Sequence, residues 1–278
     1  MLAGVATGVV GAILGTGGGV FLIPVLVLVF DVPMHYAIAT SIVSVIATSS
    51  AVASASVERG TANMKLGMTL EIATSTGAIL GGVTAAYLSA TVLEALFAVV
   101  LVPTAWFMWR GREDEEHDPP SAIDTSPAAA ESATQAPGAL DSEFFDESLG
   151  RTVRYHVARL WAGLIVSFFA GNLSGLLGIG GGVFKVPAIH LLCRVPIKAA
   201  AATSNFMIGV TAAASAFVYF GRGEVRPALA GSVVIGTLIG SMVGNRLSHR
   251  VGANIVRQMF SLLLVAVAIY MAIRAGSG

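Results

Sequence analysis

Hydrophobic residues dominate the chain in long runs that polar residues interrupt at intervals. Eight such segments lie at roughly 2–30, 36–57, 66–88, 92–110, 156–193, 199–220, 228–246 and 253–274. Most of them approach or exceed the ~20 residues that an α-helix needs to cross a hydrocarbon core ~30 Å thick. The pattern therefore predicts an all-α polytopic membrane protein with about eight hydrophobic segments.

One stretch between the fourth and fifth segments departs from this pattern. Residues 111–150 are rich in proline, alanine, serine and acidic side chains, and they show no apolar period. Such a stretch buries too little apolar surface to offset the entropy that folding removes. We expect a first membrane domain over 1–110, a disordered acidic linker over 111–150 and a second membrane domain over 151–278.

The two membrane domains repeat one another. A shift of 163 residues places 15–41 on 178–204 without a gap, and 14 of these 27 positions are then identical. Each copy carries the same glycine run, as "GTGGGVFLIP" at 15–24 and as "GIGGGVFKVP" at 178–187. The chain is therefore expected to be a duplicated unit of four segments, an arrangement common among secondary transporters.

The glycine run is expected to break the first segment of each repeat, because glycine costs roughly 1 kcal/mol relative to alanine in a helix. Unpaired backbone at membrane depth is tolerated only where protein or a water-filled cavity surrounds it. Its free N–H groups, with the positive end of the following helix, would form an anion site. The alternative is a tight crossing of helices at which glycine only permits contact. The predicted cradle consists of Gly15, Gly17, Gly18, Gly19, Gly178, Gly180, Gly181 and Gly182.

Hydroxyl and amide side chains follow each glycine run. The tripeptide Ala-Thr-Ser occurs at 39–41 and again at 202–204. Its hydroxyls can donate to an anion without burying a charge, although such hydroxyls also bond back to their own helix. The polar side chains assigned to the anion site are Thr40, Ser41, Thr203, Ser204 and Asn205.

Lys185 distinguishes the second copy from the first, where Leu22 holds the matching position. A lysine inside a membrane segment marks a functional site by default, unless its stem lets the ammonium group reach the interface. We expect Lys185 to supply the positive charge of the anion site. Glu71 and His190 are candidates for proton coupling, but Glu71 lies near a segment end, which favours the interface, and His190 also fits a packing role.

Glycines spaced four apart recur elsewhere in the chain, at 4 and 8, at 77 and 81, and at 236, 240 and 244. Residues with this spacing share one face of a helix, and small residues there let neighbouring backbones approach closely. These glycines are therefore expected to serve helix packing.

Charge is distributed unevenly along the chain. A formal net charge of zero conceals a linker of −10 and a membrane body of +10, because 111–150 contain eleven acids and one base. The positive-inside rule then places the linker in the cytoplasm. The rule gives this result whether the first segments span the membrane or re-enter it as hairpins, which would invert the repeats.

The sequence offers no motif for catalysis or for a cofactor. The glycine run lacks the Lys-Ser/Thr ending of a phosphate loop and the third glycine of a dinucleotide site. Ser174 in "GNLSG" lacks a base with evident pairing geometry, and Cys193, the single cysteine, excludes an intrachain disulfide and a cysteine-rich metal site. We expect no enzyme activity, no catalytic residue, no metal or other cofactor and no nucleic-acid partner.

The duplicated Gly-x-Gly-Gly-Gly-x-x-x-x-Pro run, with the proline and the Ala-Thr-Ser that follow it in 33–41 and 196–204, resembles the sulfite exporter TauE/SafE family of membrane permeases. The resemblance covers the chain apart from 111–150. It implies an exporter of small sulfur-containing anions such as sulfite or organosulfonates, working by alternating access in the inner or plasma membrane, with protons as a coupling ion. The alternatives are an anion channel of the same fold and a non-transporting scaffold that acts through its linker. The sequence does not set the oligomeric state.

Overall fold

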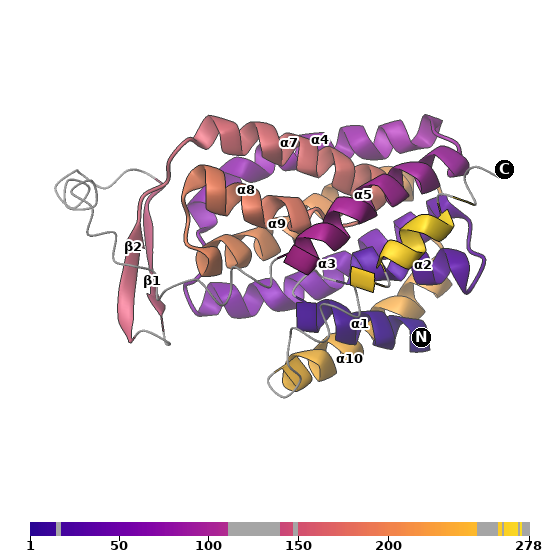
Figure 1. The fold of residues 1–278 in the computed structure, drawn as a ribbon, viewed down its shortest axis with the longest axis horizontal. Coiled ribbons are helices and arrows are strands. Elements are labelled where there is room, and N and C mark those ends of the chain that lie inside the picture. The colour runs from indigo at the N-terminus through magenta and orange to yellow at the C-terminus, as the bar shows by residue number, and fades with distance from the viewer. Residues whose placement is uncertain are drawn as a thin grey trace.

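The computed structural model describes residues 1–14, 18–110, 140–146, 150–248, 261–262, 264–271 and 273. The described part is mostly helical, as expected. Among these residues, five helices, α3, α4, α7, α9 and α10, are long and apolar enough to cross a membrane, and shorter apolar helices lie in α1, α2, α5 and α8. The elements shown in Figure 1 are α1 (Leu2–Leu14), α2 (Gly19–Leu28), α3 (Met34–Glu58), α4 (Met64–Tyr87), α5 (Ala90–Arg110), β1 (Ser142–Asp146), β2 (Arg151–Tyr155), α7 (Leu160–Leu177), α8 (Gly182–Cys193), α9 (Ile197–Gly221) and α10 (Pro227–Ser248).

The helices follow the predicted hydrophobic segments, and the first and fifth segments are each split in two at the glycines. α1 ends at Leu14 and α2 begins at Gly19, while α7 ends at Leu177 and α8 begins at Gly182. Helical residues at 261–262, 264–271 and 273 belong to the last predicted segment. The start of that segment lies outside the described residues, so the count of eight segments and the duplication stay predictions.

Each glycine break is the tip of a helical hairpin. The N–H of Ala158, just before α7, donates to the carbonyl of Cys193 at the end of α8 at 3.0 Å. The outer ends of α7 and α8 therefore meet. In the first pair, a Cβ added at Gly18 would lie 3.3 Å from the carbonyl oxygen of Thr7 in the middle of α1. A continuous helix rising ~1.5 Å per residue would separate these two residues by about 16 Å, so the chain turns back towards α1. Both observations favour the re-entrant alternative.

α3 and α9 run through the bundle in opposite directions. The N–H of Asn63, in the turn from α3 to α4, donates to Thr203 Oγ1 near the start of α9 at 2.9 Å. At the other end, His35 at the start of α3 and Arg222 after α9 both contact carbonyl groups near the end of α4. We call the end with β1, β2 and Asn63 the linker end, and the end with His35 and Arg222 the far end.

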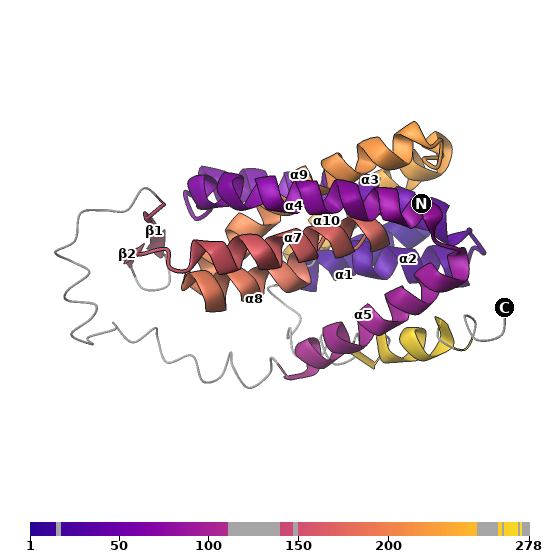
Figure 2. The ribbon, with the colours of Figure 1, turned by 90° about the horizontal axis from the view of Figure 1, so that it is seen from above.

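Glycine faces bring two pairs of helices into backbone contact, as their spacing predicted. α1 packs on α10 (Figure 1), and α4 packs on α7 (Figure 2). A Cβ added at Gly8 would lie 2.8 Å from Thr237 Cα, and one added at Gly171 would lie 2.8 Å from Thr74 Cα. No side chain fits at that separation, so glycine is required for these helices to approach as closely as they do.

A two-stranded hairpin covers the linker end. β1 pairs antiparallel with β2, and Phe144 of β1 belongs to a buried apolar cluster with Leu66 of α4, Ile189 of α8 and Ala199 of α9. Burial of Tyr155 at this contact raises the pKa of its phenol. Residues 140–146 of the predicted linker are therefore ordered and docked, whereas 111–139 and 147–149 lie outside the described residues.

Asn63 links α4, α9 and the strand hairpin at the linker end of the bundle. Its side chain accepts from the N–H of Leu66 at 3.0 Å, which caps the start of α4, and donates to the carbonyl of Leu140 ahead of β1 at 2.9 Å. A side-chain cap of this kind satisfies a backbone N–H that the first helical turn leaves free. The same residue thus joins α4, the strand hairpin and, through Thr203, α9.

Replacement of Phe144 by alanine is expected to release the strand hairpin. The ring is 5% exposed, and truncating a buried phenylalanine costs about 3–5 kcal/mol. The matched control is Phe145→Ala, because the neighbouring ring is 56% exposed. Limited trypsin digestion with mass spectrometry should show cleavage after Arg151 and Arg154 at least tenfold faster in the first variant only. Equal rates in both variants would contradict this docking.

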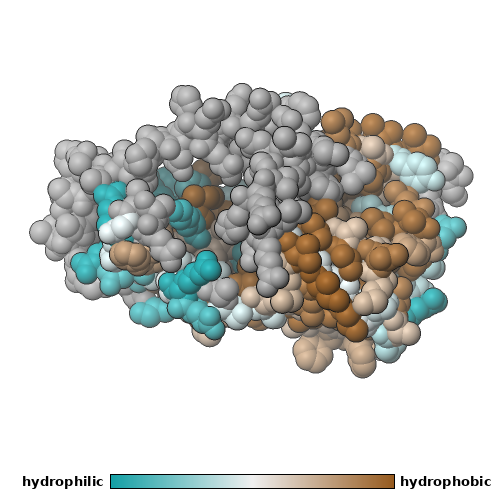
Figure 3. Space-filling model, turned by 90° about the horizontal axis from the view of Figure 1, so that it is seen from below, coloured by the Kyte–Doolittle hydropathy of each residue, from teal (hydrophilic) through white to brown (hydrophobic). Residues whose placement is uncertain are grey.

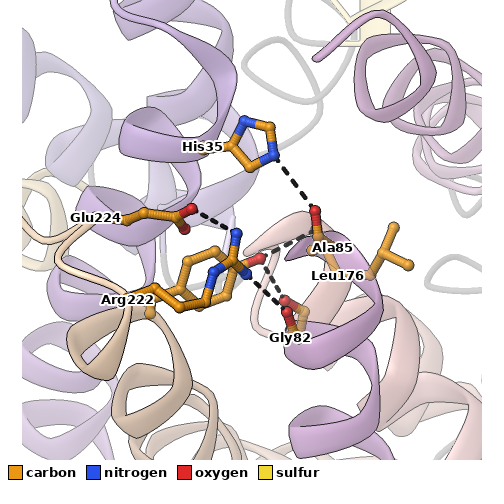
Figure 4. A network of polar contacts seen from close by, with 8 residues as sticks. His35, Gly82, Ala85, Leu176, Arg222 and Glu224 are labelled. Carbon is orange, nitrogen blue, oxygen red and sulfur yellow. Dashed lines mark hydrogen bonds and ion pairs between the residues drawn. The ribbon is translucent and has the colours of Figure 1, made fainter. Parts of the chain in front are cut away.

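Polar contacts tie the helices together at the far end (Figure 4). Arg222 Nη1 donates to the carbonyl of Gly82 at 3.0 Å and pairs with Glu224. The hydroxyl of Tyr219 donates to the carbonyl of Gly175 at 2.9 Å, and His35 Nε2 lies 3.3 Å from the carbonyl of Ala85. These contacts join α3, α4, α7 and α9 at this end.

The surface of the bundle separates apolar from polar residues. In the space-filling view, brown apolar residues gather over the half away from the strand hairpin, and hydrophilic residues gather at the linker end (Figure 3). Large exposed apolar side chains occur on several long helices, among them Ile72, Ile165, Phe217 and Met242. Surface of this kind suits contact with lipid rather than with water.

Candidate functional site

The two helix breaks are built on left-handed glycines. Gly18 has a φ of 75° and Gly181 a φ of 71°, and each directly precedes the first residue of a helix, α2 or α8. Gly178 and Gly180 also have positive φ, at 68° and 81°. Residues with a Cβ pay about 1–2 kcal/mol to enter this region, which explains why the turn needs glycine.

The breaks meet in the centre of the bundle. Ser41 Oγ of α3 lies 2.9 Å from the carbonyl oxygen of Gly178 and 3.2 Å from that of Gly19, so one side chain holds both breaks. A Cβ added at Gly19 would lie 2.6 Å from Val45 of α3. At the second break, a Cβ added at Gly182 would lie 2.5 Å from Ile208 of α9.

Val45 and Ile208 are themselves 163 residues apart, and so are Gly19 and Gly182. Corresponding residues of the two predicted repeats therefore make corresponding contacts around the breaks.

The N-termini of α2 and α8 converge at this point, and the first N–H groups of each are not used by its own helix. The first helical bonds of α2 run from Phe21 and Leu22 to the Gly18 carbonyl, and those of α8 run from Phe184 and Lys185 to the Gly181 carbonyl. The N–H groups that precede them in each helix have no partner within the helix. Two such ends, each carrying roughly half a positive charge, favour an anion between them.

The hydroxyl groups of the two Ala-Thr-Ser tripeptides have different hydrogen-bond partners. Thr40 bonds back to the carbonyl of Tyr36 at 2.7 Å in its own helix. Thr203 accepts from Asn63 at the linker end, and Ser41 holds the breaks. Ser204 differs, because its Oγ is buried and has no hydrogen-bond partner among the described residues. A Cβ at Gly182 would lie 3.9 Å from that oxygen, so a free donor stands beside the start of α8.

Lys185 lies one helical turn into α8 and is 0% exposed. A Cβ added at Gly181 would lie 3.6 Å from its Cε, so its stem passes close to the break. Its ammonium group donates to Thr211 Oγ1 of α9 at 2.6 Å. The structure thus keeps this lysine inside the protein, where a cation needs a negative partner, and does not let it reach the interface.

A carboxylate completes this cluster. Thr211 Oγ1 donates to Glu71 Oε1 at 2.7 Å, and Ser75 Oγ donates to the same oxygen at 2.7 Å. Glu71 is 7% exposed, and its second oxygen, Oε2, is buried without a hydrogen-bond partner among the described residues. The cluster therefore holds one cation and one carboxyl group bridged by a hydroxyl, with one free acceptor atom.

The structure gathers part of the predicted site and leaves part of it elsewhere. Gly18, Gly19, the four glycines of 178–182, Ser41, Ser204 and Lys185 surround the meeting point of the breaks. Gly15 and Gly17 lie outside the described residues, and Asn205 is half-buried on α9. His190 is half-buried near the end of α8, with Nδ1 2.8 Å from the carbonyl of Val195. The described break residues are buried, so an ion reaches them only when helices move apart.

Sequence reasoning did not identify Thr211 or Ser75. Thr211 could have been found from its spacing, because Ser204, Ile208 and Thr211 follow one another at four and three residues on one face of α9. Ser75 stands four residues after Glu71, which is the same kind of signal. The sequence also placed Glu71 towards the interface, whereas the structure buries it. No group of three or more His, Cys, Asp or Glu side chains in the described part of the chain could hold a metal ion.

Comparison with known proteins agrees with the family resemblance found in the sequence. The model of the family described as "Sulfite exporter TauE/SafE" matches residues 1–271. The chain is 26% identical over 271 residues to the "Probable membrane transporter protein YunE" of Bacillus subtilis, covering 95% of this chain and 90% of that protein. It is 25% identical to a "Probable membrane transporter protein" of Xylella fastidiosa, covering 93% and 88%. No solved structure matches the chain.

Proposed function

The chain belongs to the sulfite exporter TauE/SafE family, and we propose that within this family of membrane transporters it is a secondary transporter that exports small sulfur-containing anions. Sulfite and organosulfonates are the substrates proposed, with alternating access to one central site. The single observation that carries the proposal is Lys185, a fully buried cation at the N-terminal end of α8.

The chemistry around Lys185 suits a small oxyanion. Sulfite carries up to two negative charges and a sulfonate carries one. The ammonium group supplies a full charge, while the helix ends at Gly19 and Gly182 supply partial charges and oriented N–H donors. The Ser204 hydroxyl adds a donor that no other described group uses. Sulfur oxyanions present several oxygen atoms in a small volume, so such a set of convergent donors would recognise them.

The opposite directions of α3 and α9, and the two helical hairpins, support an inverted repeat with the anion between its halves. Such repeats provide alternating access by rocking around a fixed site near the midplane. Basic residues support a cytoplasmic linker end through the positive-inside rule, because among the described residues more of them lie at this end than at the far end, where Arg222 and Arg226 lie. The basic residues at or near helix and strand ends on the linker side are Arg59, Lys65, Arg151, Arg154, Arg159, Arg194 and Lys198.

A flux screen in proteoliposomes tests this proposal. Sulfite, thiosulfate, sulfoacetate and sulfate would each be offered with and without a pH gradient. We expect saturable uptake and counterflow of at least one anion, at rates well above those of protein-free liposomes. Deletion of residues 113–139, which precede the docked hairpin, should leave that flux in place.

Three results would contradict the proposal. Background rates for all four anions would exclude these substrates. Ohmic currents without counterflow would identify a channel. Loss of cellular function on deletion of 113–139, with no flux in any sample, would favour the scaffold.

A further inference from the structure

Glu71 has an arrangement that anion binding alone does not require. It is a buried carboxyl group with one oxygen, Oε1, held by Thr211 and Ser75, and a second oxygen, Oε2, without a partner in the described part of the chain. Buried polar atoms are paired in the great majority of cases, so an unpaired carboxylate oxygen needs an explanation. Oε2 is therefore a position at which a proton can bind without displacing an existing hydrogen bond.

Among the residues that the structure describes, few other ionisable groups face Glu71. It belongs to α4, which packs on α7 and α9, and α7 carries no ionisable side chain. On α9, Lys198 and Tyr219 lie at the two ends of the helix. On α8, His190 bonds to the Val195 carbonyl, and Cys193 lies against Gly163 of α7. Lys185 is therefore the charged group, among the described residues, that is linked to Glu71, and the hydroxyl of Thr211 makes this link.

The charge balance of the site changes when an anion enters. In the empty site, the Glu71 carboxylate compensates the Lys185 ammonium through the hydroxyl of Thr211. An anion that binds Lys185 adds a negative charge to this closed space, and two negative groups then share one lysine. Like charges at close range in a low-dielectric site favour protonation of one of them. Protonation of Glu71 would restore the balance.

We propose that Glu71 is the proton-coupling group of this transporter: ionised in the empty site, it takes up one proton at Oε2 when an anion binds at Lys185. This inference rests on the proposed function and specifies its coupling ion. Lys185 keeps its proton throughout, so each turnover moves one anion together with one proton held on the Glu71 carboxyl group. Of the two candidates from the sequence, Glu71 is preferred over His190 because it is linked to Lys185.

Anion binding measured against pH tests this inference. The probes are methanesulfonate and sulfate, whose charges stay constant between about pH 5 and 8, so that only the protein titrates. In the wild type, the affinity for the anion should fall up to tenfold for each unit by which the pH rises. Binding should also draw about one proton per anion from a weakly buffered solution containing a pH indicator. Glu71→Gln should bind with an affinity independent of pH and without proton uptake.

Two further variants separate coupling from structural damage. Glu94→Gln makes the same change at another buried carboxyl group, 6% exposed on α5, and should retain the wild-type pH slope. Ser75→Ala removes a hydroxyl that donates to Glu71, so the fall in affinity should begin at a higher pH. This displacement, by up to about one pH unit, would not follow from a purely structural role.

The outcomes distinguish the two proposals. A wild-type protein that binds the anions with no pH slope and no proton uptake overturns the coupling role and leaves anion transport standing. Retention of the slope in Glu71→Gln also overturns it. Failure of the wild type to bind either anion at any pH contradicts the anion site itself.

Discussion

Replacement of Lys185 by leucine is expected to remove anion binding and transport while the protein stays folded. Leucine is the residue at the matching position of the first copy, Leu22, which is fully buried. Truncating one partner of a buried, hydrogen-bonded charge pair costs about 2–5 kcal/mol in binding, which corresponds to a loss of at least roughly thirtyfold in affinity. Titration calorimetry of the purified protein with the transported anion measures this loss.

The same substitution leaves Glu71 as a buried carboxyl group without its cation, so the single variant is also expected to be less stable. The double variant Lys185→Leu with Glu71→Gln removes both charges and should recover the melting temperature without recovering anion binding. Recovery of both properties would mean that Lys185 serves the fold and not the anion. Unchanged affinity in the single variant would place the site elsewhere.

A second large effect is expected at the crossing of α4 and α7, where Gly171→Ala should destabilise the protein. Its new Cβ would lie 2.8 Å from Thr74 Cα and closer still to the Thr74 carbonyl group. Because backbone cannot move aside as a side chain does, we expect a cost of about 3 kcal/mol or more. This cost exceeds the gain of about 1 kcal/mol that alanine brings to a helix.

The matched control for this crossing is Gly231→Ala on α10, where an added Cβ meets nothing within 4 Å. That variant should be as stable as the wild type or slightly more stable. Thermal melting of both variants in the same detergent gives the comparison. Equal melting temperatures would show that the two helices can separate at no cost, contrary to the packing described.

The sequence predicts the features that local chemistry decides. The hydrophobic runs predict the helices, and the glycine runs predict where α2 and α8 begin, because three glycines lower helix stability wherever they stand. Lys185 could be recognised because a lysine in an apolar segment is anomalous without any knowledge of the fold. The spacing of Gly4 and Gly8, and of Gly77 and Gly81, predicts close helix crossings, because small residues four apart share one face of a helix.

Features that depend on distant partners could not be predicted. Glu71 and Thr211 are 140 residues apart in the chain, so only the packing of α4 on α9 brings the carboxyl group to Lys185. The sequence predicts Ser41 at the anion site, but the bond from its hydroxyl to the carbonyl of Gly178, 137 residues away, depends on the packing of the two breaks. Phe144 lies in a stretch whose composition indicates disorder, and its ordering depends on the apolar pocket between α4, α8 and α9.

The structure also explains how the breaks of the two predicted repeats differ. The first break contributes backbone and the hydroxyl of Ser41, whereas the second contributes Lys185 with the free hydroxyl of Ser204. Among the described residues, the second break has the charge of Lys185 to balance, and Glu71 is linked to that charge through Thr211. Two predicted repeats, one of them with a charged break, are consistent with a single anion site shared by both breaks.

The central claim is that an anion binds where the two helix breaks meet. The most direct test is a crystal structure with the selenium analogue of the transported anion, selenite for sulfite or selenate for sulfate, located by its anomalous signal. The account predicts one selenium peak within about 4 Å of Lys185 Nζ, between the first residues of α2 and α8. A peak elsewhere in the protein, or no peak at a saturating concentration, would contradict it.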